Sequence, residues 1–388
     1  MPDLPSFDMA ASDWHFTKTF RRKAYGWRSS SLAVARVREA VAEVRLANRL
    51  DPRFAAEGAV LFLRKVSPAL EDVDSSSGAL GAAVHHAIAE LVPVIANAPC
   101  DAATREKWLD SLFDALQDDQ IPYIETLSDH WGTLCASPDI AATWAERLVG
   151  IVERIFDDAT PPGAHFAGTS ACLSALHASG QHQRLLRLLD CRRGGFWHYR
   201  IWGVKALRSL GRHDEALAYA DATDRRWAPA AHVAAVCEAI LLDQGKVDEA
   251  YARFGLAATT ATTHVARLRA LLRKYPGRAP ADILHDLVAE DPTRSGKWFA
   301  AAKDLKLYDE AIELATRSPA DPHTLLRAAR DFETRRPAFA IACARLALHW
   351  VDRGYGFDVM AADVQQAHTI IARCLSAGDD GQTARDAT

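Results

Sequence analysis

The residues of this chain that are best suited to chemistry form an acidic run in its first half. The run comprises Asp114, Asp118, Asp119, Glu125 and Asp129, and His130 follows it. Carboxylates beside an imidazole could hold a metal ion or transfer protons. Residues 118–122 are also typical of a polar loop between two helices, where acidic side chains are common. The loop is the preferred interpretation, and the chemical one stays open.

Histidine and cysteine spacing argues against a metal centre. His85 and His86 are adjacent, and adjacent side chains on a helix point about 100° apart, so we expect solvated surface histidines. The seven cysteines include no pair closer than the 19 positions from Cys172 to Cys191, which excludes short-spaced metal or redox pairs. An odd number also argues against a disulfide framework. Cys172 and Cys237 lie in apolar helical stripes, which predicts buried, unreactive thiols.

The signatures of phosphate binding and of nucleophilic catalysis are incomplete. Residues 295–297 are Ser-Gly-Lys, but the upstream glycine and the strand of a P-loop are missing. No Gly-x-Ser-x-Gly elbow occurs in the chain. The sequence therefore predicts a protein that is not an enzyme and that has no catalytic residue, cofactor or metal.

A basic, aromatic segment near the start of the chain is the strongest candidate for phosphate contacts. Residues 18–28 contain five basic residues, three aromatic residues and no acid. Cations bind phosphates and aromatic rings stack on bases, so Arg21, Arg22, Lys23 and Trp27 are candidate contact residues. In the preferred alternative, the aromatic residues only dock this segment onto the first helical hairpin while the cations stay solvated. Binding of a protein partner is a third interpretation.

Composition and net charge argue against several classes of protein. The net charge of −4 gives no electrostatic case for a general nucleic-acid or membrane-surface binder, and 49% hydrophobic residues exclude a wholly disordered chain. Residues 1–14 lack the basic start and apolar run of a secretory signal, and we find no run of about 18 uncharged apolar residues. We expect a cytoplasmic protein with no membrane partner. The 36 Arg against 10 Lys suggest, by association, a bacterial source.

Apolar residues recur three and four positions apart through most of the chain, a spacing that predicts helices and almost no strand. Val34, Val37, Val41 and Val44 form the first such stripe, with N-cap candidates at residues 29–31. The next stripes predict helices from Asp51 to about Val66, over 80–95, after Asp101, and through 124–134 and 144–155. Pro93, inside one of these stripes, is expected to kink or shorten its helix.

Four stretches in the second half of the chain share one turn. They are 210–216 (Leu-Gly-Arg-His-Asp-Glu-Ala), 244–250 (Gln-Gly-Lys-Val-Asp-Glu-Ala), 307–311 (Leu-Tyr-Asp-Glu-Ala) and, with the glycine alone, 179–182 (Ser-Gly-Gln-His). Gly180, Gly211 and Gly245 follow one another at intervals of 31 and 34 positions. Self-similarity at this period indicates stacked helical hairpins, each of which needs its neighbours to bury its apolar face.

This turn, within a hairpin of about 34 residues, resembles the tetratricopeptide repeat (TPR) family over residues 163–320. The matching residues are Gly211, Ala216, Gly245, Ala250, Phe254 and Ala257, and the departures are Leu185, Gly203, Val204 and Lys306. The resemblance implies an all-α fold, an α-solenoid of antiparallel helical hairpins wound into a TPR-like superhelix. The first half of the chain shows helix pairs without a readable repeat consensus.

The resemblance also implies where a partner would bind. In TPR-like proteins the first helix of each hairpin lines a concave groove that usually binds peptides or other proteins. Residues 196–205 would form such a helix, and we expect Trp197, Arg200, Lys205 and Arg208 to contact the partner. In the preferred alternative, the aromatic residues fill the core between hairpins and the cations are solvated.

These patterns predict an organisation and a function. We expect an N-terminal arm over 1–30 with a loose start over 1–17, a helical-repeat lobe over 31–158, a TPR-like lobe over 163–376 and a flexible tail over 377–388. The Pro- and Gly-rich stretch 157–163 marks the boundary between the lobes. The predicted function is a scaffold or adaptor that binds a protein or peptide in the groove. The alternative is a nucleic-acid-associated regulatory or defence factor that uses residues 18–28.

Overall fold

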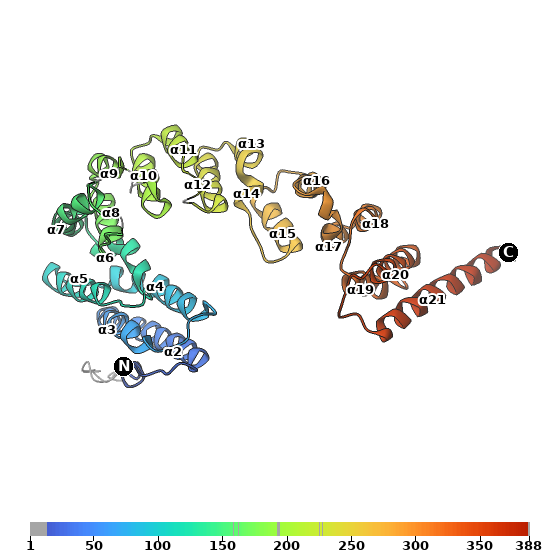
Figure 1. Cartoon of the computed structure of the whole chain (residues 1–388), viewed down its shortest axis with the longest axis horizontal. Coiled ribbons are helices and arrows are strands. Elements are labelled where there is room, and N and C mark those ends of the chain that lie inside the picture. The colour runs from blue at the N-terminus through green and yellow to red at the C-terminus, as the bar shows by residue number, and fades with distance from the viewer. Residues whose placement is uncertain are drawn as a thin grey trace, which may run out of the picture. The chain divides into compact units, whose positions relative to one another are not determined.

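The protein consists of helices and turns. The computed structural model describes residues 14–157, 159–161, 163–191, 195–224, 226 and 228–386, with side chains up to residue 376. Over these residues it contains no strand, which confirms the all-α prediction. The chain divides into two compact units, unit 1 (Met1–Ala228) and unit 2 (Pro229–Thr388). Figure 1 labels most of the α-helices of both units.

Unit 1 begins with long helices and continues with shorter ones. Its elements are α1 (Phe16–Thr19), α2 (Ser30–Asn48), α3 (Pro52–Leu70), α4 (Ala79–Asn97), α5 (Ala102–Gln117), the 3-10 helix η1 (Glu125–His130), α6 (Trp131–Cys135), α7 (Pro138–Phe156), α8 (Thr169–Ala178), α9 (His182–Leu189), α10 (Trp197–Ser209) and α11 (His213–Asp221). α3 and α5 begin at the predicted N-cap residues. Asp51 accepts a hydrogen bond from the backbone N–H of Phe54 (3.0 Å), and Asp101 accepts one from that of Thr104 (2.7 Å). Ser29 precedes α2 but makes no side-chain cap.

Two helices continue through a proline, and at Pro93 this differs from the expectation of a shorter helix. α3 passes Pro68 and ends at Leu70 rather than near Val66, and α4 passes Pro93 without ending. A proline inside a helix removes one backbone hydrogen bond. Here the residues beyond each proline are buried in the core, and this burial outweighs the lost bond.

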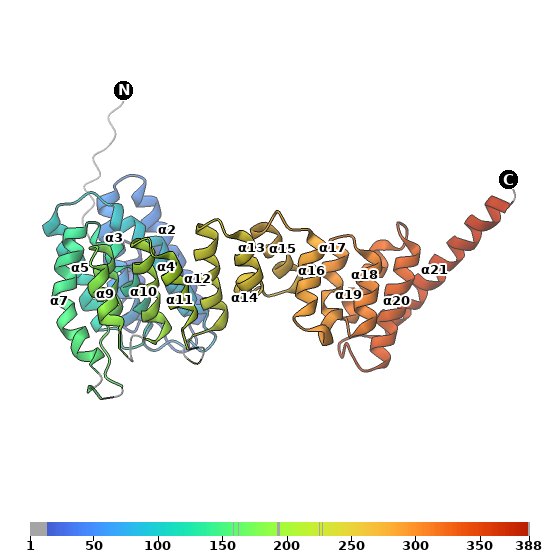
Figure 2. The same cartoon turned by 90° about the horizontal axis from the view of Figure 1, so that it is seen from above.

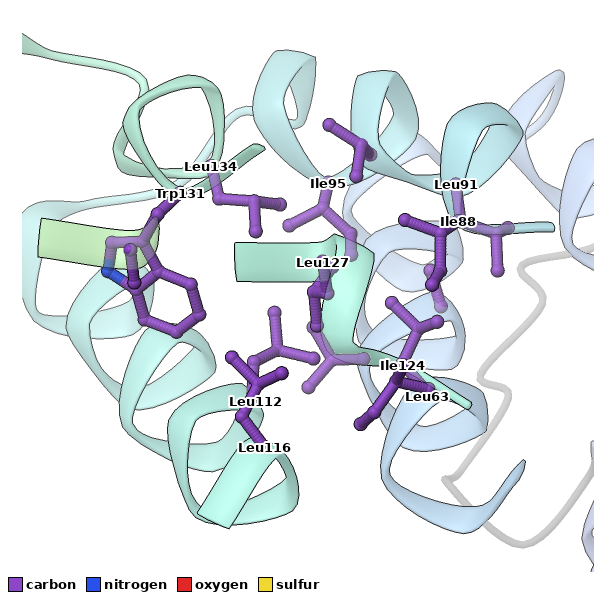
Figure 3. Packing of buried hydrophobic residues seen from close by; sticks show 14 of the residues in the cluster. Leu63, Ile88, Leu91, Ile95, Leu112, Leu116, Ile124, Leu127, Trp131 and Leu134 are labelled. Atoms are coloured by element: carbon purple, nitrogen blue, oxygen red, sulfur yellow. The ribbon is translucent and has the colours of Figure 1, made fainter. Parts of the chain in front are cut away.

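The core of unit 1 lies between α3, α4, α5 and η1. Figure 3 shows side chains of all four elements converging around Ile124 and Leu127. The labelled residues are Leu63, Ile88, Leu91, Ile95, Leu112, Leu116, Ile124, Leu127, Trp131 and Leu134, all buried. α4 is long and apolar enough to cross a membrane by length and composition. Its apolar stripe nevertheless belongs to this core, as expected for the central helix of a globular unit.

The start of unit 1 is packed rather than loose. Trp14 is buried and stacks on Phe54 with ring centroids 4.6 Å apart, and it lies so close to Gly58 that a Cβ there would overlap its ring. Phe20 and Tyr25 are also buried, as the docking interpretation requires, whereas Trp27 is 67% exposed and does not dock. The prediction of a loose start was therefore wrong for residues 14–17, and residues 1–13 lie outside the described part.

The predicted boundary at 157–163 lies inside unit 1, and the units separate at 228/229 instead. The helices on either side of the predicted boundary, α7 and α8, pack on each other and share one hydrophobic core. Proline and glycine mark a loop in the sequence, but only burial decides whether the elements that a loop joins belong to one unit.

Unit 2 continues with helical pairs (Figure 2). Its elements are α12 (Ala230–Asp243), α13 (Val247–Ala250), the π-helix η3 (Tyr251–Gly255), α14 (Leu256–Ala258), α15 (His264–Lys274), α16 (Pro280–Ala289), the 3-10 helix η4 (Pro292–Trp298), α17 (Phe299–Asp304), α18 (Tyr308–Arg317), α19 (Pro322–Phe332), α20 (Pro337–Asp352) and α21 (Ala361–Asp386). The backbone of α21 continues through residues 377–386, most of the predicted flexible tail. Residues 387–388 lie outside the described part.

The turn predicted to repeat has the same geometry at all four places. The residue at the glycine position has a left-handed φ at Gly180 (76°), Gly211 (72°) and Gly245 (74°), and at Lys306 (64°), which takes this position directly before 307–311. The next residue donates its N–H to the carbonyl five positions earlier, as in the bond from Arg212 to Leu207 (2.9 Å). The equivalent bonds run from Gln181 to Leu176, Lys246 to Leu241 and Leu307 to Ala302. This closure is the Schellman motif, and it satisfies carbonyls at the end of the first helix.

The residues after the turn have physical roles in the helix that follows. The acidic pairs, such as Asp214 and Glu215, lie in its first turn, where negative charge interacts favourably with the helix dipole. Ala216, Ala250 and Ala311 are completely buried. Their small side chains let the two helices of a pair approach each other closely.

The departure at Gly203 has a structural reason. A Cβ at Gly203 in α10 would lie 2.7 Å from the ring of Tyr219 in α11. The large side chain that fills this contact therefore comes from the second helix of the pair rather than from the first.

Lys306 is the one turn residue of the four that is not glycine, and we expect Lys306→Gly to stabilise unit 2. A left-handed conformation costs a side-chain-bearing residue roughly 1–2 kcal/mol, which is partly offset by the greater freedom of glycine in the unfolded chain. The expected gain in free energy of unfolding is about 0.5–1 kcal/mol, measured by urea denaturation.

The reverse change, Gly245→Ala, should destabilise the same unit by about 1 kcal/mol. Gly277→Ala is the matched control, because Gly277 has no left-handed φ and a Cβ there would meet nothing within 4 Å. A stabilising Gly245→Ala or a destabilising Lys306→Gly would show that these turns are not under conformational constraint.

Candidate functional site

A cavity of unit 1 lies where three connections between its helices meet. It has a volume of about 1150 Å³. Its walls come from the end of α7 and the loop after it, from the start of α10, and from the loop after α11. Its aromatic lining residues are Phe156, Phe166, Phe196 and Tyr199, with His165 and His198 beside them.

The start of α10 is the central wall of this cavity. Phe196 precedes α10 in an extended conformation, and Tyr199 packs against Phe156 with ring centroids 5.2 Å apart. Beyond its first turn, α10 is buried through Trp202, Val204, Ala206 and Leu207. Burial of these residues fixes the rotation of the helix, and His198 and Tyr199 in its first turn line the cavity.

Arg200 lines the same cavity and also holds two helices together. Its Nε and Nη2 donate to the carbonyl oxygen of Tyr219 at 2.9 and 2.7 Å, and its guanidinium stacks on the Tyr219 ring at 3.7 Å. The structure thus places this predicted contact residue at the cavity but gives its donors an internal role. The other charged lining residues, Asp224 and Arg226, form an ion pair.

A smaller cavity of about 410 Å³ adjoins the first. The two share His165, Phe166, His198 and Tyr199 as lining residues. The smaller one is further lined by three acids, Asp119, Glu125 and Asp129, and by no Lys or Arg among the described residues.

The acidic run therefore divides into structural and cavity-facing members. Asp119 accepts hydrogen bonds from the Ser67 hydroxyl and from the backbone N–H of Ile124 (2.9 Å), and burial raises the pKa of its carboxyl. It organises the loop before η1, as the loop interpretation requires. Asp114 and Asp118 are exposed and line neither cavity. No group of three His, Cys, Asp or Glu residues in the described chain is arranged to hold a metal ion.

Two hydroxyls that line these cavities have no hydrogen-bond partner within the described residues. They are Thr223 Oγ1 in the larger cavity and Thr126 Oγ1 in the smaller one. Thr223 is only 4% exposed. A buried hydroxyl without a partner is unfavourable by roughly 1–3 kcal/mol, so both groups would gain from a hydrogen-bonding ligand.

The remaining predicted contact residues of α10 lie outside the described lining of both cavities. Trp197 is half-buried at the first position of α10, and Arg208 is half-buried in its last turn. Lys205 is half-buried with its ammonium 3.7 Å from the Trp202 ring, and burial lowers its pKa. The structure thus brings one of the four predicted residues, Arg200, to the larger cavity.

The basic segment 18–28 is partly neutralised by unit 1 itself. Arg22 pairs with Glu71 at 3.1 Å, and Lys23 lies 3.8 and 3.6 Å from Glu71 and Asp72. Arg21 is exposed, and the side chain of Trp27 extends into solvent.

The other sequence candidates have structural environments. His85 and His86 are exposed, and His86 pairs with Glu90 at 2.9 Å. Cys172 is buried, which raises the pKa of its thiol to about 12, and Cys237 is buried as well. Gly296 contacts the end of α18 so closely that a Cβ would lie 2.1 Å from the Ser318 carbonyl oxygen, so the Ser-Gly-Lys stretch is a packing site.

A histidine cluster that spacing could not reveal lies beside α10. His177 and His182 face each other across the Gly180 turn with ring centroids 5.2 Å apart, and His177 Nε2 lies 3.1 Å from the Ser209 hydroxyl. Their separation of five positions is not a helical repeat; the tight turn between α8 and α9 brings them together.

A comparison with protein-family models and with curated proteins finds no match for this chain.

We expect the stability of unit 1 to fall between pH 7.5 and pH 5.5. Burial lowers the pKa of His130, His177 and His198 below the value near 6.5 of an unfolded chain. The unfolded state therefore binds more protons in this window, so the free energy of unfolding decreases as the pH falls. Urea titrations over this range measure the decrease.

His177→Gln should make this pH dependence shallower, because it removes one of the buried imidazoles. Neighbouring His182 and Lys205 also lower the pKa of His177, so their charges oppose its protonation. His85→Gln, on the exposed face of α4, is the matched control and should leave the slope unchanged. A slope equal in wild type and both variants would contradict the assignment.

Proposed function

We propose that this chain is a non-enzymatic adaptor whose unit 1 binds a peptide segment of a partner protein in the cavity at the start of α10. The larger cavity and its aromatic lining carry this proposal. Small-molecule pockets usually measure about 300–1,000 Å³, so a cavity of about 1150 Å³ suits a peptide segment better than a metabolite. Aromatic side chains are the commonest anchors of protein interfaces.

The packing order of the helices supports a TPR-like solenoid as the frame. In unit 1, α2 packs on α4, α4 on α6, α6 on α8 and α8 on α10, in addition to the packing between sequence neighbours. Unit 2 has the same alternation in α15 with α17, α18 with α20 and α19 with α21. Contacts of this kind are expected of stacked helical hairpins, in which every second helix belongs to the same layer. The Schellman turns and buried alanines support the same frame.

The absence of disulfides among the described cysteines agrees with a cytoplasmic adaptor. None of the seven forms a disulfide in the described chain, as is usual in a reducing compartment. Burial raises the pKa of Cys135 and Cys343 to about 12, so these thiols are protonated at neutral pH and poorly suited to nucleophilic chemistry.

Panning a displayed library of random peptides against the full chain tests the proposal. We expect enriched peptides to lose at least about 2 kcal/mol of binding free energy, roughly thirtyfold in Kd, when Tyr199 is replaced by Ala, because the variant removes an aromatic wall of the cavity. Fluorescence anisotropy of a labelled peptide measures the loss, and thermal unfolding checks that the variant folds.

Tyr355→Ala is the control, since Tyr355 is an exposed aromatic residue of unit 2 outside both cavities. It should bind the peptides as wild type does. Peptides that bind wild type and Tyr199→Ala equally well would contradict the proposed site.

The second candidate is the nucleic-acid-associated factor, favoured by the exposure of Trp27 beside Lys18, Arg21 and Arg28. These three cations have no ion-pair partner among the described residues, whereas Arg22 and Lys23 are paired. Three phosphate contacts would weaken binding to single strands steeply as salt increases. In this case a mobility shift at low salt should disappear in the double variant Arg21→Ala/Trp27→Ala. No shift of wild type at 20 mM salt would eliminate this candidate.

A further inference from the structure

The two adjoining cavities differ in charge, and this difference points to the chemistry of a ligand that fills both. The larger cavity is lined by Arg200, Arg226 and Asp224, of which the last two neutralise each other. Its described lining residues therefore carry one net positive charge, which disfavours a cation there. Among the described residues that line the smaller cavity, three are acids and none is Lys or Arg.

Two of these acids are available to a ligand. Asp119 is held by the loop before η1, but Glu125 and Asp129 are exposed and make no ion pair within 4 Å in the described chain. Lys205 is close enough for Asp129 to act on its pKa, yet it is not a lining residue. His198 is shared by both cavities, and its lowered pKa leaves the imidazole neutral at pH 7, so it does not oppose a cation.

We propose that the partner peptide presents an apolar side chain next to a lysine or arginine. The apolar side chain would occupy the larger cavity among Phe156, Phe166 and Tyr199, and the cation would enter the smaller one beside Glu125 and Asp129. The cavities share four lining residues, so neighbouring positions of one extended peptide can supply both side chains.

The two unpartnered hydroxyls fit the same ligand. A peptide backbone carries a donor and an acceptor at nearly every residue, so it can bond the Thr223 hydroxyl while its side chain fills the larger cavity. The Thr126 hydroxyl lies in the smaller, acidic cavity. Its oxygen can accept a hydrogen bond from an ammonium or guanidinium group, which has donors and no acceptor.

This inference rests on the proposed peptide-binding function, and its test separates the two. Random 12-residue peptides displayed on phage are panned against the full chain, and the best binder is synthesised with its basic residue intact and with that residue replaced by Gln. We expect enrichment of sequences with a Lys or Arg beside an aromatic or aliphatic residue. The double variant Glu125→Gln/Asp129→Asn should raise the Kd of the intact peptide about tenfold at low salt and by less at high salt.

The same double variant should leave the Gln-substituted peptide unaffected, because the lost interaction requires both partners. Asp114→Asn/Asp118→Asn removes the same charge from unit 1 outside the cavities and should have no effect on either peptide.

Two outcomes overturn the proposal in different ways. Peptides that depend on Tyr199 but lack a basic residue, or that bind the Glu125→Gln/Asp129→Asn variant as tightly as wild type, would overturn the inference and leave the peptide-binding function standing. Failure to enrich any peptide that depends on Tyr199 would overturn the function, and the inference with it.

Discussion

The repeated left-handed turn is the constraint on which the helical pairs depend. Each turn uses only three residues outside the helices, so the chain reverses at once and the second helix lies along the first. α9 and α11 have eight and nine residues, too few for an isolated helix to be stable in water. Their stability therefore comes from the apolar contacts that the reversal enforces, and the buried alanines keep those contacts close.

The cavities lie where the connections between helices are longer than these turns. The connection from α7 to α8 and the connection from α9 to α10 are several residues longer than the turns within the pairs. Side chains carried by these connections, Phe166 and Phe196 among them, wall a cavity instead of packing between two helices. The tight turn between α10 and α11 thus lets Arg200 and Tyr219 fix the position of α10. The longer connections form a recessed aromatic surface beside it.

Local signals in the sequence predicted the helical fold well. Spacing of apolar residues and the Asp51 and Asp101 caps depend on neighbours along the chain, so they can be read without tertiary structure. The glycine turns belong to the same class, and their geometry is preserved even at Lys306. The errors at Pro93 and at residues 157–163 have one cause, since each local signal for an ending was outweighed by burial that involves distant residues.

The candidate site was less predictable because it is assembled from separate segments. The aromatic content of residues 196–205 predicted contact residues in α10, and one of them, Arg200, lines the larger cavity. Phe156 and Phe166, however, precede α10 by tens of residues and carry no spacing signal. The acidic run was visible as a group, but only tertiary structure separates Asp119, which holds a loop, from Glu125 and Asp129, which face the smaller cavity. The pairing of Arg22 and Lys23 with acids of the 71–72 turn was equally invisible, because it joins residues about fifty positions apart.

Hydrogen–deuterium exchange of the full chain, with and without a saturating bound peptide, tests most directly whether unit 1 binds partners at the start of α10. Binding there should slow exchange in residues 164–170 and 195–201, which carry the shared lining of the two cavities. Exchange in α2 and α20 should stay unchanged. Slowed exchange confined to α2, to the basic segment 18–28 or to unit 2 would contradict this location of the binding site.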